Sequence, residues 1–348
     1  MIQKRHAIGI DLGGTSIKFG LIDSDGQFLY EGKVPSYADI SAEKIINQLI
    51  QVAKETQSFA DKHRLPVTGI GIGTPGITDT TGRMVLGGAE NLQGWQKLAL
   101  AEIMEKATGL PVTLNNDANA MGLGELAYGA GKGCTDIVFL TVGTGIGGAI
   151  VIDGKLFSGY ANRGTELGHV PLIAIGERCA CGATGCLEHY ASTAALVRRF
   201  TALANEQGLD FHAEINGELI VRLYHESFPL AIKCMNEHFY YLGRGIAGFI
   251  NIFSPQRVVI GGGLSEAGDF YLEKVSNVAF EHALDTCAPN TQIIKACLGN
   301  KAGTIGAVSL VFQSLPPSQC NLKLYFAYGH KKRSTAVLQP LLTLNLIL

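Results

Sequence analysis

The stretch "DLGGTSIK" at residues 11–18 joins two apolar runs, 7–10 and 19–22. It places a carboxylate, two glycines and two hydroxyl side chains where one strand is expected to turn into the next. A tight hairpin turn accounts for the glycines alone. A cradle of backbone N–H groups for phosphate, with Asp11 near a metal ion, accounts for the whole stretch. The rest of the sequence has to decide between these two interpretations.

Length and composition are those of an ordinary globular protein. The chain has 348 residues, of which 47% are hydrophobic and 17% charged, and its formal net charge is −2. This length allows a sizeable core and is more typical of two domains than of one. Without a basic patch, nucleic acid and anionic membranes are not expected as partners. The first residues run directly into an apolar strand with no secretory signal, so we expect a cytoplasmic protein.

Hydrophobic periodicity predicts alternating strands and helices, and hence an α/β fold. The expected strands are 7–12, 16–23, 27–34, 67–73, 112–115, 256–260 and 291–295, with a Gly-rich hairpin over 137–152. The expected helices are 41–63, 98–108, 118–128, 187–205, 215–225, 229–250, 269–285 and 302–313.

An internal repeat divides this order. "IGIDLGGTSIKFGLIDSDGQFL" at 8–29 aligns with "VFLTVGTGIGGAIVIDGKLF" at 138–157 once a two-residue gap is allowed. Repetition of a whole supersecondary unit predicts a duplicated domain. We expect an N-terminal domain over 1–117, a larger domain over 118–313, and a helix near 302–313 that packs back on the first. The tail, 314–348, matches no pattern, and its status is left open.

Three Gly-rich turns follow predicted strands, at 11–15, 141–148 and 261–265. The second contains Gly143-x-Gly145-x-x-Gly148, the spacing of a dinucleotide-binding turn. That turn requires a helix after the glycines, and here a strand follows. No GxxxxGK[ST] motif is present either. The interpretation that remains is a pair of hairpin tips that face each other across a cleft and hold the two ends of a triphosphate. Three unrelated tight turns are the alternative.

Three cysteines and a histidine are closely spaced: His169, Cys179, Cys181 and Cys186. Three thiolates and one imidazole form a closed tetrahedral set suited to a structural Zn²⁺. The glycines between them permit the tight turns that such a set needs. Reduced cysteines in a loop are the alternative.

The sequence resembles the ROK family of sugar kinases, and especially the bacterial glucokinases of that family. The matching segments, which occur in family order over about 7–312, are "DLGGTSIK", "GIGTPGITD", "AENLQGW", "LNNDANAMGLGE", "LTVGTGIGGAIV", "NRGTELGHV", "CACGATGCLEHYAS" and "VVIGGGLS". The resemblance implies two duplicated actin- or ribonuclease-H-like domains around a ligand cleft. It implies ATP with Mg²⁺ as cofactor and zinc at the Cys/His set, and it suggests a homodimer.

The resemblance also assigns site residues. It implies that ATP and Mg²⁺ are bound by Asp11, Gly13, Gly14, Thr15, Lys18, Gly143, Thr144, Gly145, Gly147, Gly262 and Gly263. It places the sugar on Gly76, Asn91, Asn116, Asp117, Glu166, His169 and Glu188. It makes Asp117 the general base, although a helix N-cap is the usual role of an aspartate in that position. Lys18 is as readily a solvated lysine at a strand edge, and each sugar-site residue taken singly has an ordinary structural role.

We therefore expect an ATP-dependent hexokinase, with glucose as the acceptor and glucose 6-phosphate as the product. Kinases of N-acetylmannosamine, N-acetylglucosamine, allose and fructose share the same framework and remain alternatives. A sugar-sensing repressor of this family would carry a winged helix-turn-helix before the first phosphate turn. Because that turn begins at residue 11, we do not expect such a module here.

Overall fold

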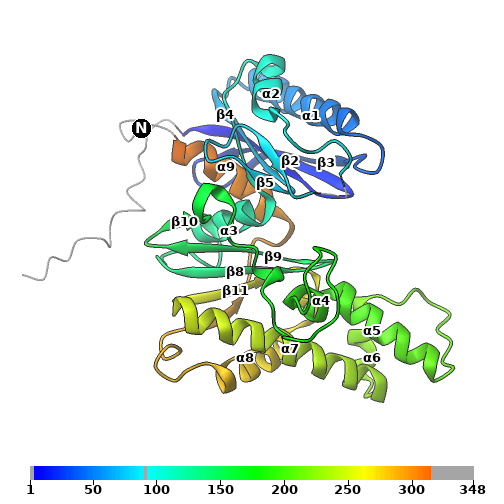
Figure 1. Cartoon of the computed structure of the whole chain (residues 1–348). Helices are drawn as coiled ribbons and strands as arrows, with labels where there is room; N and C mark the ends of the chain where they lie inside the picture. Colours follow the sequence, from blue (N-terminus) through cyan, green and yellow to red (C-terminus); the bar gives the residue numbers. More distant parts are fainter. Residues whose placement is uncertain (1–3, 90–91, 315–348) are drawn as a thin grey trace, which may run out of the picture. The chain divides into compact units, whose positions relative to one another are not determined.

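The computed structural model describes residues 4–89 and 92–314. Two five-stranded sheets form its framework (Figure 1). The first has the order β3-β2-β1-β4-β7, with β1 (His6–Leu12), β2 (Ser16–Asp23), β3 (Phe28–Pro35), β4 (Val67–Thr74) and β7 (Val112–Asn116). The second has the order β10-β9-β8-β11-β12, with β8 (Ile137–Val142), β9 (Ile146–Ile152), β10 (Lys155–Phe157), β11 (Arg257–Gly261) and β12 (Gln292–Lys295).

The two sheets share one topology. In each, three antiparallel strands in sequence are followed by two strands parallel to the first. Leu12 pairs with Ile17 at the end of the first hairpin, and Val142 pairs with Ile146 at the end of the second. The α/β fold and the duplication read from the sequence are confirmed, and a helix after the second glycine turn is excluded.

Helices cover the outer faces of both sheets. On the first lie α1 (Ala42–Lys62) and α2 (Leu100–Thr108), which bury leucine and isoleucine side chains against the strands. The second sheet shares its core with α4 (Leu187–Ala191), α5 (Thr193–Glu206), α6 (Gly217–His225), α7 (Pro229–Phe253) and α8 (Asp269–His282). Burial of these faces supplies most of the favourable free energy of each half.

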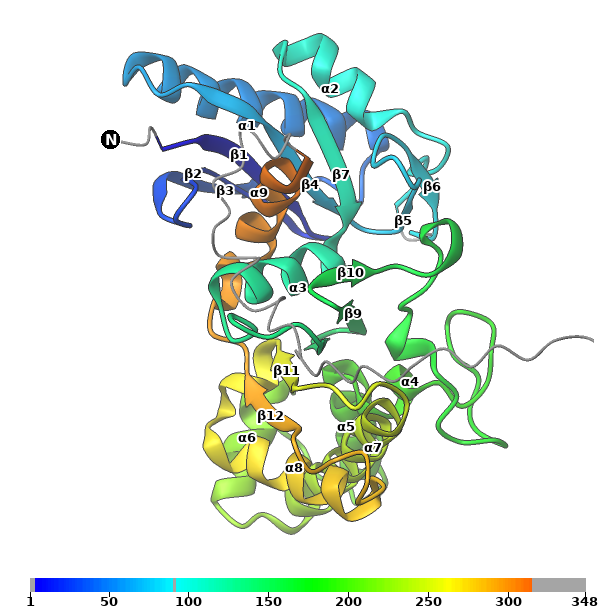
Figure 2. The same cartoon turned by 90° about the vertical axis from the view of Figure 1, so that its left-hand side faces the viewer.

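Two helices, α3 (Asp117–Tyr128) and α9 (Ala302–Ser314), lie between the sheets (Figures 1 and 2). The helix α9 packs on β1 and β4 of the first sheet and on α3, which also contacts β9 of the second. Glycine permits this close packing: a Cβ at Gly71 would lie 1.7 Å from the carbonyl oxygen of Ala307, and one at Gly306 would lie 1.6 Å from that of Ala120.

One predicted helix is wrong. The segment 187–205 is not continuous, because Ser192 has an extended backbone (φ −73°, ψ 162°) that ends α4 and begins α5. The Ser192 hydroxyl accepts the Ala195 N–H at 3.1 Å and so caps the second helix. The side chain thus starts a new helix where periodicity alone predicts one helix.

Within residues 4–89 and 92–314 no helix has the length and apolar character needed to cross a membrane. The tail predicted over 314–348 lies outside the described residues except for Ser314, which ends α9. The domain limits at 117 and 313 stay predictions.

Candidate active site

A cavity of about 350 Å³ opens between the carboxyl end of β7, the turn between β8 and β9, and the loop that leads to the cysteine cluster. It brings together ten of the residues predicted for sugar or phosphate: Gly76, Asn116, Asp117, Gly143, Thr144, Gly145, Gly147, Glu166, His169 and Glu188. Asn91, also predicted for the sugar, lies outside the described residues.

Asp117 is the first residue of α3, directly after β7. The helix is capped by the preceding residue, since the Asn116 side chain accepts the Asn119 N–H at 3.2 Å. Asn116 also donates from Nδ2 to the Gly76 carbonyl at 3.1 Å. The ordinary role considered for Asp117, that of the N-cap, is therefore wrong: its carboxylate accepts the Ala118 N–H at 2.9 Å, and Asp117 lines the cavity.

Burial raises the pKa of the Asp117 carboxyl to about 6. The Ala118 N–H opposes this shift, while the negative charges of Asp11 and Glu166 add to it. A carboxylate with a pKa near 6 is ionised at neutral pH and accepts a proton more readily than an ordinary aspartate. The site therefore holds a base suited to a hydroxyl group.

Asp11 lies next to Asp117, across Gly73. A Cβ at Gly73 would be 3.9 Å from an Asp11 carboxylate oxygen and 3.6 Å from the Asp117 Cα, so the glycine lies between the two aspartates. The Asp11 side chain is buried, and burial raises the pKa of its carboxyl, whereas Lys18, whose Nζ is 3.9 Å away, lowers it. Lys18 also reaches Asn300 at 3.4 Å, so it is not a free strand-edge lysine.

The first glycine turn closes β1 on β2 but does not line the cavity. The Gly13 N–H donates to the Ser16 carbonyl at 3.0 Å, and the Ser36 hydroxyl donates to the Gly14 carbonyl at 2.9 Å. Nothing lies within 4 Å of the position that a Cβ on Gly14 would take, which leaves the tip open to a ligand. Thr15 accepts the Ser36 N–H at 3.1 Å through its carbonyl.

The second glycine turn is held by a carboxylate from outside the sheet. Glu188 on α4 accepts the Ile146 N–H at 2.8 Å, and a Cβ at Gly145 would lie 2.4 Å from the same carboxylate oxygen. The Gly143 carbonyl accepts the Thr193 N–H at 2.8 Å. A residue predicted for the sugar thus holds a turn predicted for phosphate.

The third glycine turn follows β11 and lies apart from this cavity. Gly262 has φ +100°, and a Cβ there would meet the Val142 carbonyl oxygen at 2.1 Å, so the turn packs tightly against the end of β8. Gly263 has open space beside it. A second cavity lies nearby, between Glu266 and Lys295 and the loop 296–299.

The ligand atoms of His169, Cys179, Cys181 and Cys186 lie within 4.8 Å of one another. Cys181 Sγ is 3.6 Å from Cys186 Sγ, and Cys179 Sγ is 3.9 Å from His169 Nδ1. With Zn–S bonds of about 2.3 Å, tetrahedral geometry sets sulfur atoms about 3.8 Å apart. The four side chains therefore fit a closed zinc site, and they bind the loop behind Glu166 to the start of α4.

Among the further residues that line the cavity, which sequence reasoning did not assign, are Asn119, Asn162 and Thr165. Asn162 donates from Nδ2 to the Asp79 carbonyl at 3.2 Å, across the cavity mouth. All three lie within segments that match the ROK family, and this match is the signal in the sequence that could have identified them. Their position depends on tertiary contacts that the sequence does not display.

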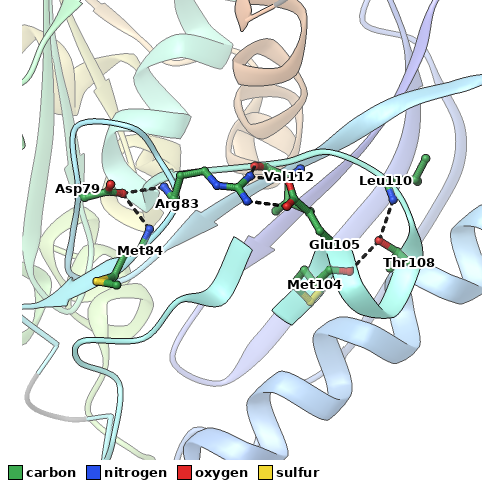
Figure 3. A network of polar contacts seen from close by, with 8 residues as sticks. All are labelled: Asp79, Arg83, Met84, Met104, Glu105, Thr108, Leu110 and Val112. Carbon is green, nitrogen blue, oxygen red and sulfur yellow. Dashed lines mark hydrogen bonds and ion pairs between the residues drawn. The ribbon is translucent and has the colours of Figure 1, made fainter. Parts of the chain in front are cut away.

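A polar network supports the segment that Asn162 contacts (Figure 3). The Asp79 carboxylate accepts the Arg83 and Met84 N–H groups at 2.6 and 2.8 Å. The Arg83 guanidinium pairs with Glu105 of α2 and donates to the Val112 carbonyl at 3.1 Å. The strands β5 (Ile77–Thr78) and β6 (Val85–Gly87) are thereby tied to α2 and β7.

Known proteins share this architecture. A glucokinase from Halalkalibacterium halodurans is 33% identical over 320 residues, which cover 90% of this chain and 96% of that protein. A xylose repressor from Caldicellulosiruptor bescii is 32% identical over 88% of this chain and 78% of its own length. The crystal structure of a ROK family glucokinase from Streptomyces griseus, in complex with glucose and AMPPNP, superposes with a TM-score of 0.76 and 33% identity, over 88% of this chain and 99% of that one.

The pattern of the ROK family itself matches residues 7–314, nearly all of the part that the structure describes. Fold, order of motifs and overall similarity agree. The chain belongs to the ROK family and has its two-domain, actin-like α/β fold.

Proposed function

We propose that this protein phosphorylates glucose, with ATP as the phosphoryl donor and Asp117 as the general base. Similarity to glucokinases over nearly the whole chain supports a sugar kinase, an ATP:hexose phosphotransferase. The choice of glucose as the sugar is the part that we propose. The observation that carries the proposal is the ionisable Asp117 carboxylate in a polar cavity that the second glycine turn also lines.

In this proposal Asp117 accepts the proton of the acceptor hydroxyl as its oxygen attacks the γ-phosphorus. The remaining hydroxyl groups of the sugar would each form a defined hydrogen bond with a backbone amide, a side-chain amide, a carboxylate or an imidazole. These groups belong to Gly76, Asn91, Asn116, Glu166, His169 and Glu188. If Nδ1 of His169 binds zinc, only its Nε2–H remains as a donor toward the sugar. Such a site distinguishes hydroxyl patterns because an unmatched sugar leaves buried polar groups unpaired.

The nucleotide would lie on the three glycine turns. Gly13, Gly14 and Thr15, together with Gly143, Thr144, Gly145 and Gly147, would offer backbone N–H groups to the phosphates. Gly262 and Gly263 would lie against the adenosine, beside the cavity that Glu266 and Lys295 border. Asp11 supplies the carboxylate oxygen that Mg²⁺ prefers, and Lys18 lies beside it. Bound Mg²⁺ would neutralise charge on the phosphates.

Zinc in the cysteine cluster would be structural, because four protein ligands leave no open position for water. We expect one zinc per chain by metal analysis of the purified protein. Removal with a chelator should raise the KM for sugar more than the KM for ATP, because the cluster holds Glu166 and His169 on the sugar side in addition to Glu188, which supports the second glycine turn. An equal effect on both KM values would contradict this role.

The test is ADP release in a coupled assay with Mg-ATP and a panel of glucose, mannose, fructose, allose, N-acetylglucosamine and N-acetylmannosamine. We expect glucose to have the highest kcat/KM, and Asp117→Asn to lower kcat by about 10²–10⁴-fold. Asp61→Asn, at an exposed position of α1, is the matched control and should leave kcat unchanged.

A different preferred sugar would replace glucose and leave the mechanism in place. Full activity in Asp117→Asn would overturn the assignment of the base. Sugar binding without turnover, in protein that retains its zinc, would favour the sensory role that its similarity to a xylose repressor suggests.

A further inference from the structure

Thr165 has a backbone conformation that a β-branched residue rarely adopts. Its φ is +68°, in the left-handed region that glycine favours. Such a conformation persists only where the surroundings fix it, and it clusters at functional sites. The same loop already contains Gly159, Gly164 and Gly168, so a glycine here would fit the local composition. The threonine side chain therefore has a role that outweighs the strain.

Thr165 is one of the residues that line the cavity, together with Asn119 and Glu166. Its hydroxyl is 2.6 Å from the Gly164 carbonyl and 3.5 Å from the Asn119 carboxamide oxygen, while Asn119 Nδ2 donates to the Asn115 side chain at 3.2 Å. Because a hydroxyl has one proton and the Gly164 carbonyl is the nearer acceptor, the Thr165 hydroxyl donates within its own loop.

The loop itself is held from both sides. At its base the Gly164 N–H donates to the Ser158 carbonyl at 2.8 Å, and after Thr165 the Leu167 N–H donates to the Thr165 carbonyl at 2.8 Å. At its tip Asn162 donates to the Asp79 carbonyl at 3.2 Å. Because both ends are fixed, the Thr165 methyl and hydroxyl groups occupy defined places in the wall.

We propose that Thr165 determines acceptor specificity: its methyl group narrows the cavity and excludes hexoses with a bulky substituent on that side. This inference rests on the proposed function, since it names the residue that restricts the sugar in the same site. One methyl group in a binding pocket changes discrimination by about 10–200-fold.

Two substitutions separate the methyl from the hydroxyl. Thr165→Ser keeps the hydroxyl and removes the methyl, so kcat/KM for N-acetylglucosamine, N-acetylmannosamine or another panel sugar should rise about tenfold relative to glucose. Thr165→Val keeps the branched shape and removes the hydroxyl, so the exclusion of larger sugars should remain. Ala161→Gly is the matched control, since Ala161 has φ +54° in the same loop but does not line the cavity; its sugar profile should equal that of the wild type.

The same panel is measured by calorimetry without nucleotide, which separates this inference from the kinase proposal. If the wild type binds sugars but does not turn them over, the proposed function fails, and a tenfold shift in relative affinity in Thr165→Ser still supports the wall. If every sugar keeps its relative kcat/KM and affinity within twofold in Thr165→Ser, the inference is overturned although the kinase stands. The same holds if Ala161→Gly shifts the profile as much as Thr165→Ser does.

Discussion

The two halves of the molecule place different chemistry on the same backbone. Asp11 and Thr141 are both the next-to-last residue of the first strand in their sheets, and each lies opposite a glycine of the parallel neighbour, Gly73 or Gly261. Across the hairpin, Asp11 pairs with Lys18, whereas Thr141 pairs with Gly147. One hairpin therefore carries a buried charged pair where the other carries a hydroxyl and a glycine.

The second hairpin gains its charge from elsewhere. Glu188 reaches it from α4, a five-residue helix that has no counterpart in the first half. The two turns are thus equivalent in backbone, and they differ because Glu188 of α4 contacts the second turn. In the proposed function, the first turn would bind phosphate beside the metal ion, and the second would couple phosphate to the sugar side of the cavity.

Among the changes that compare the two halves, the pair of equivalent positions should give the largest effect. Asp11→Asn should lower kcat about 10²–10³-fold and raise the Mg²⁺ concentration needed for half-maximal rate, because a neutral amide is a weak ligand for the cation. Thr141→Val, its counterpart in the second sheet, should change kcat less than tenfold. Steady-state kinetics over a Mg²⁺ titration compares the two. Equal losses of kcat in the two variants would show that the two hairpins do not differ in metal binding.

Glu188→Gln tests the link between the turns. The amide keeps the shape of the side chain but weakens the hydrogen bond from Ile146, since bonds to a charged acceptor contribute about 1.5–3 kcal/mol. We expect KM to rise about tenfold for both sugar and ATP, in contrast to the chelation experiment. Glu177→Gln, a more exposed partner of His189 behind the same helix, serves as the control and should leave both KM values unchanged. If only the KM for sugar rose, Glu188 would not couple the second glycine turn to the sugar site.

The sequence predicted the duplicated part of this comparison because glycine turns between apolar runs leave few alternatives to a hairpin. The family resemblance, and no pattern in the sequence by itself, implied that Asp117, Glu166 and Glu188 would meet, and all three line the cavity. The caps at Ser192 and Asn116 were missed, and Asp117 was considered as the N-cap instead, because periodicity does not show which polar residue caps a helix. That depends on the φ and ψ of the residue. Asn162 and Thr165 were missed because their roles arise from Asp79 and Asn119, which lie 83 and 46 positions away.

The raised pKa of Asp117 predicts how kcat/KM and stability depend on pH. Since the pKa of Asp117 is raised from 3.8 to about 6, kcat/KM should rise up to tenfold per pH unit below pH 6 and level off above it. Stability should change in the opposite direction. The folded state holds the proton that the unfolded state has released, so the free energy of unfolding decreases between about pH 4 and 6, by about 2–3 kcal/mol from this group.

Denaturant titrations of Asp117→Asn should lack that part of the decrease and show a protein more stable than the wild type at pH 7. The charge of Asp11 contributes to the shift, so Asp11→Asn should lower the pKa of Asp117. An unchanged stability difference between the wild type and Asp117→Asn from pH 4 to pH 7 would contradict the raised pKa.

The smallest effect separates two helix caps, one in each half. Ser41 caps α1 of the first half by accepting the Lys44 N–H at 3.2 Å, and Ser192 caps α5 of the second by accepting the Ala195 N–H at 3.1 Å. Replacement by alanine should lower the free energy of unfolding by about 1 kcal/mol in either case. Only Ser192 also ends α4, four residues after Glu188, so only Ser192→Ala should raise the KM for sugar, by a few fold. If Ser41→Ala raised it equally, the effect would reflect global stability, and the sugar site would not depend on the break between α4 and α5.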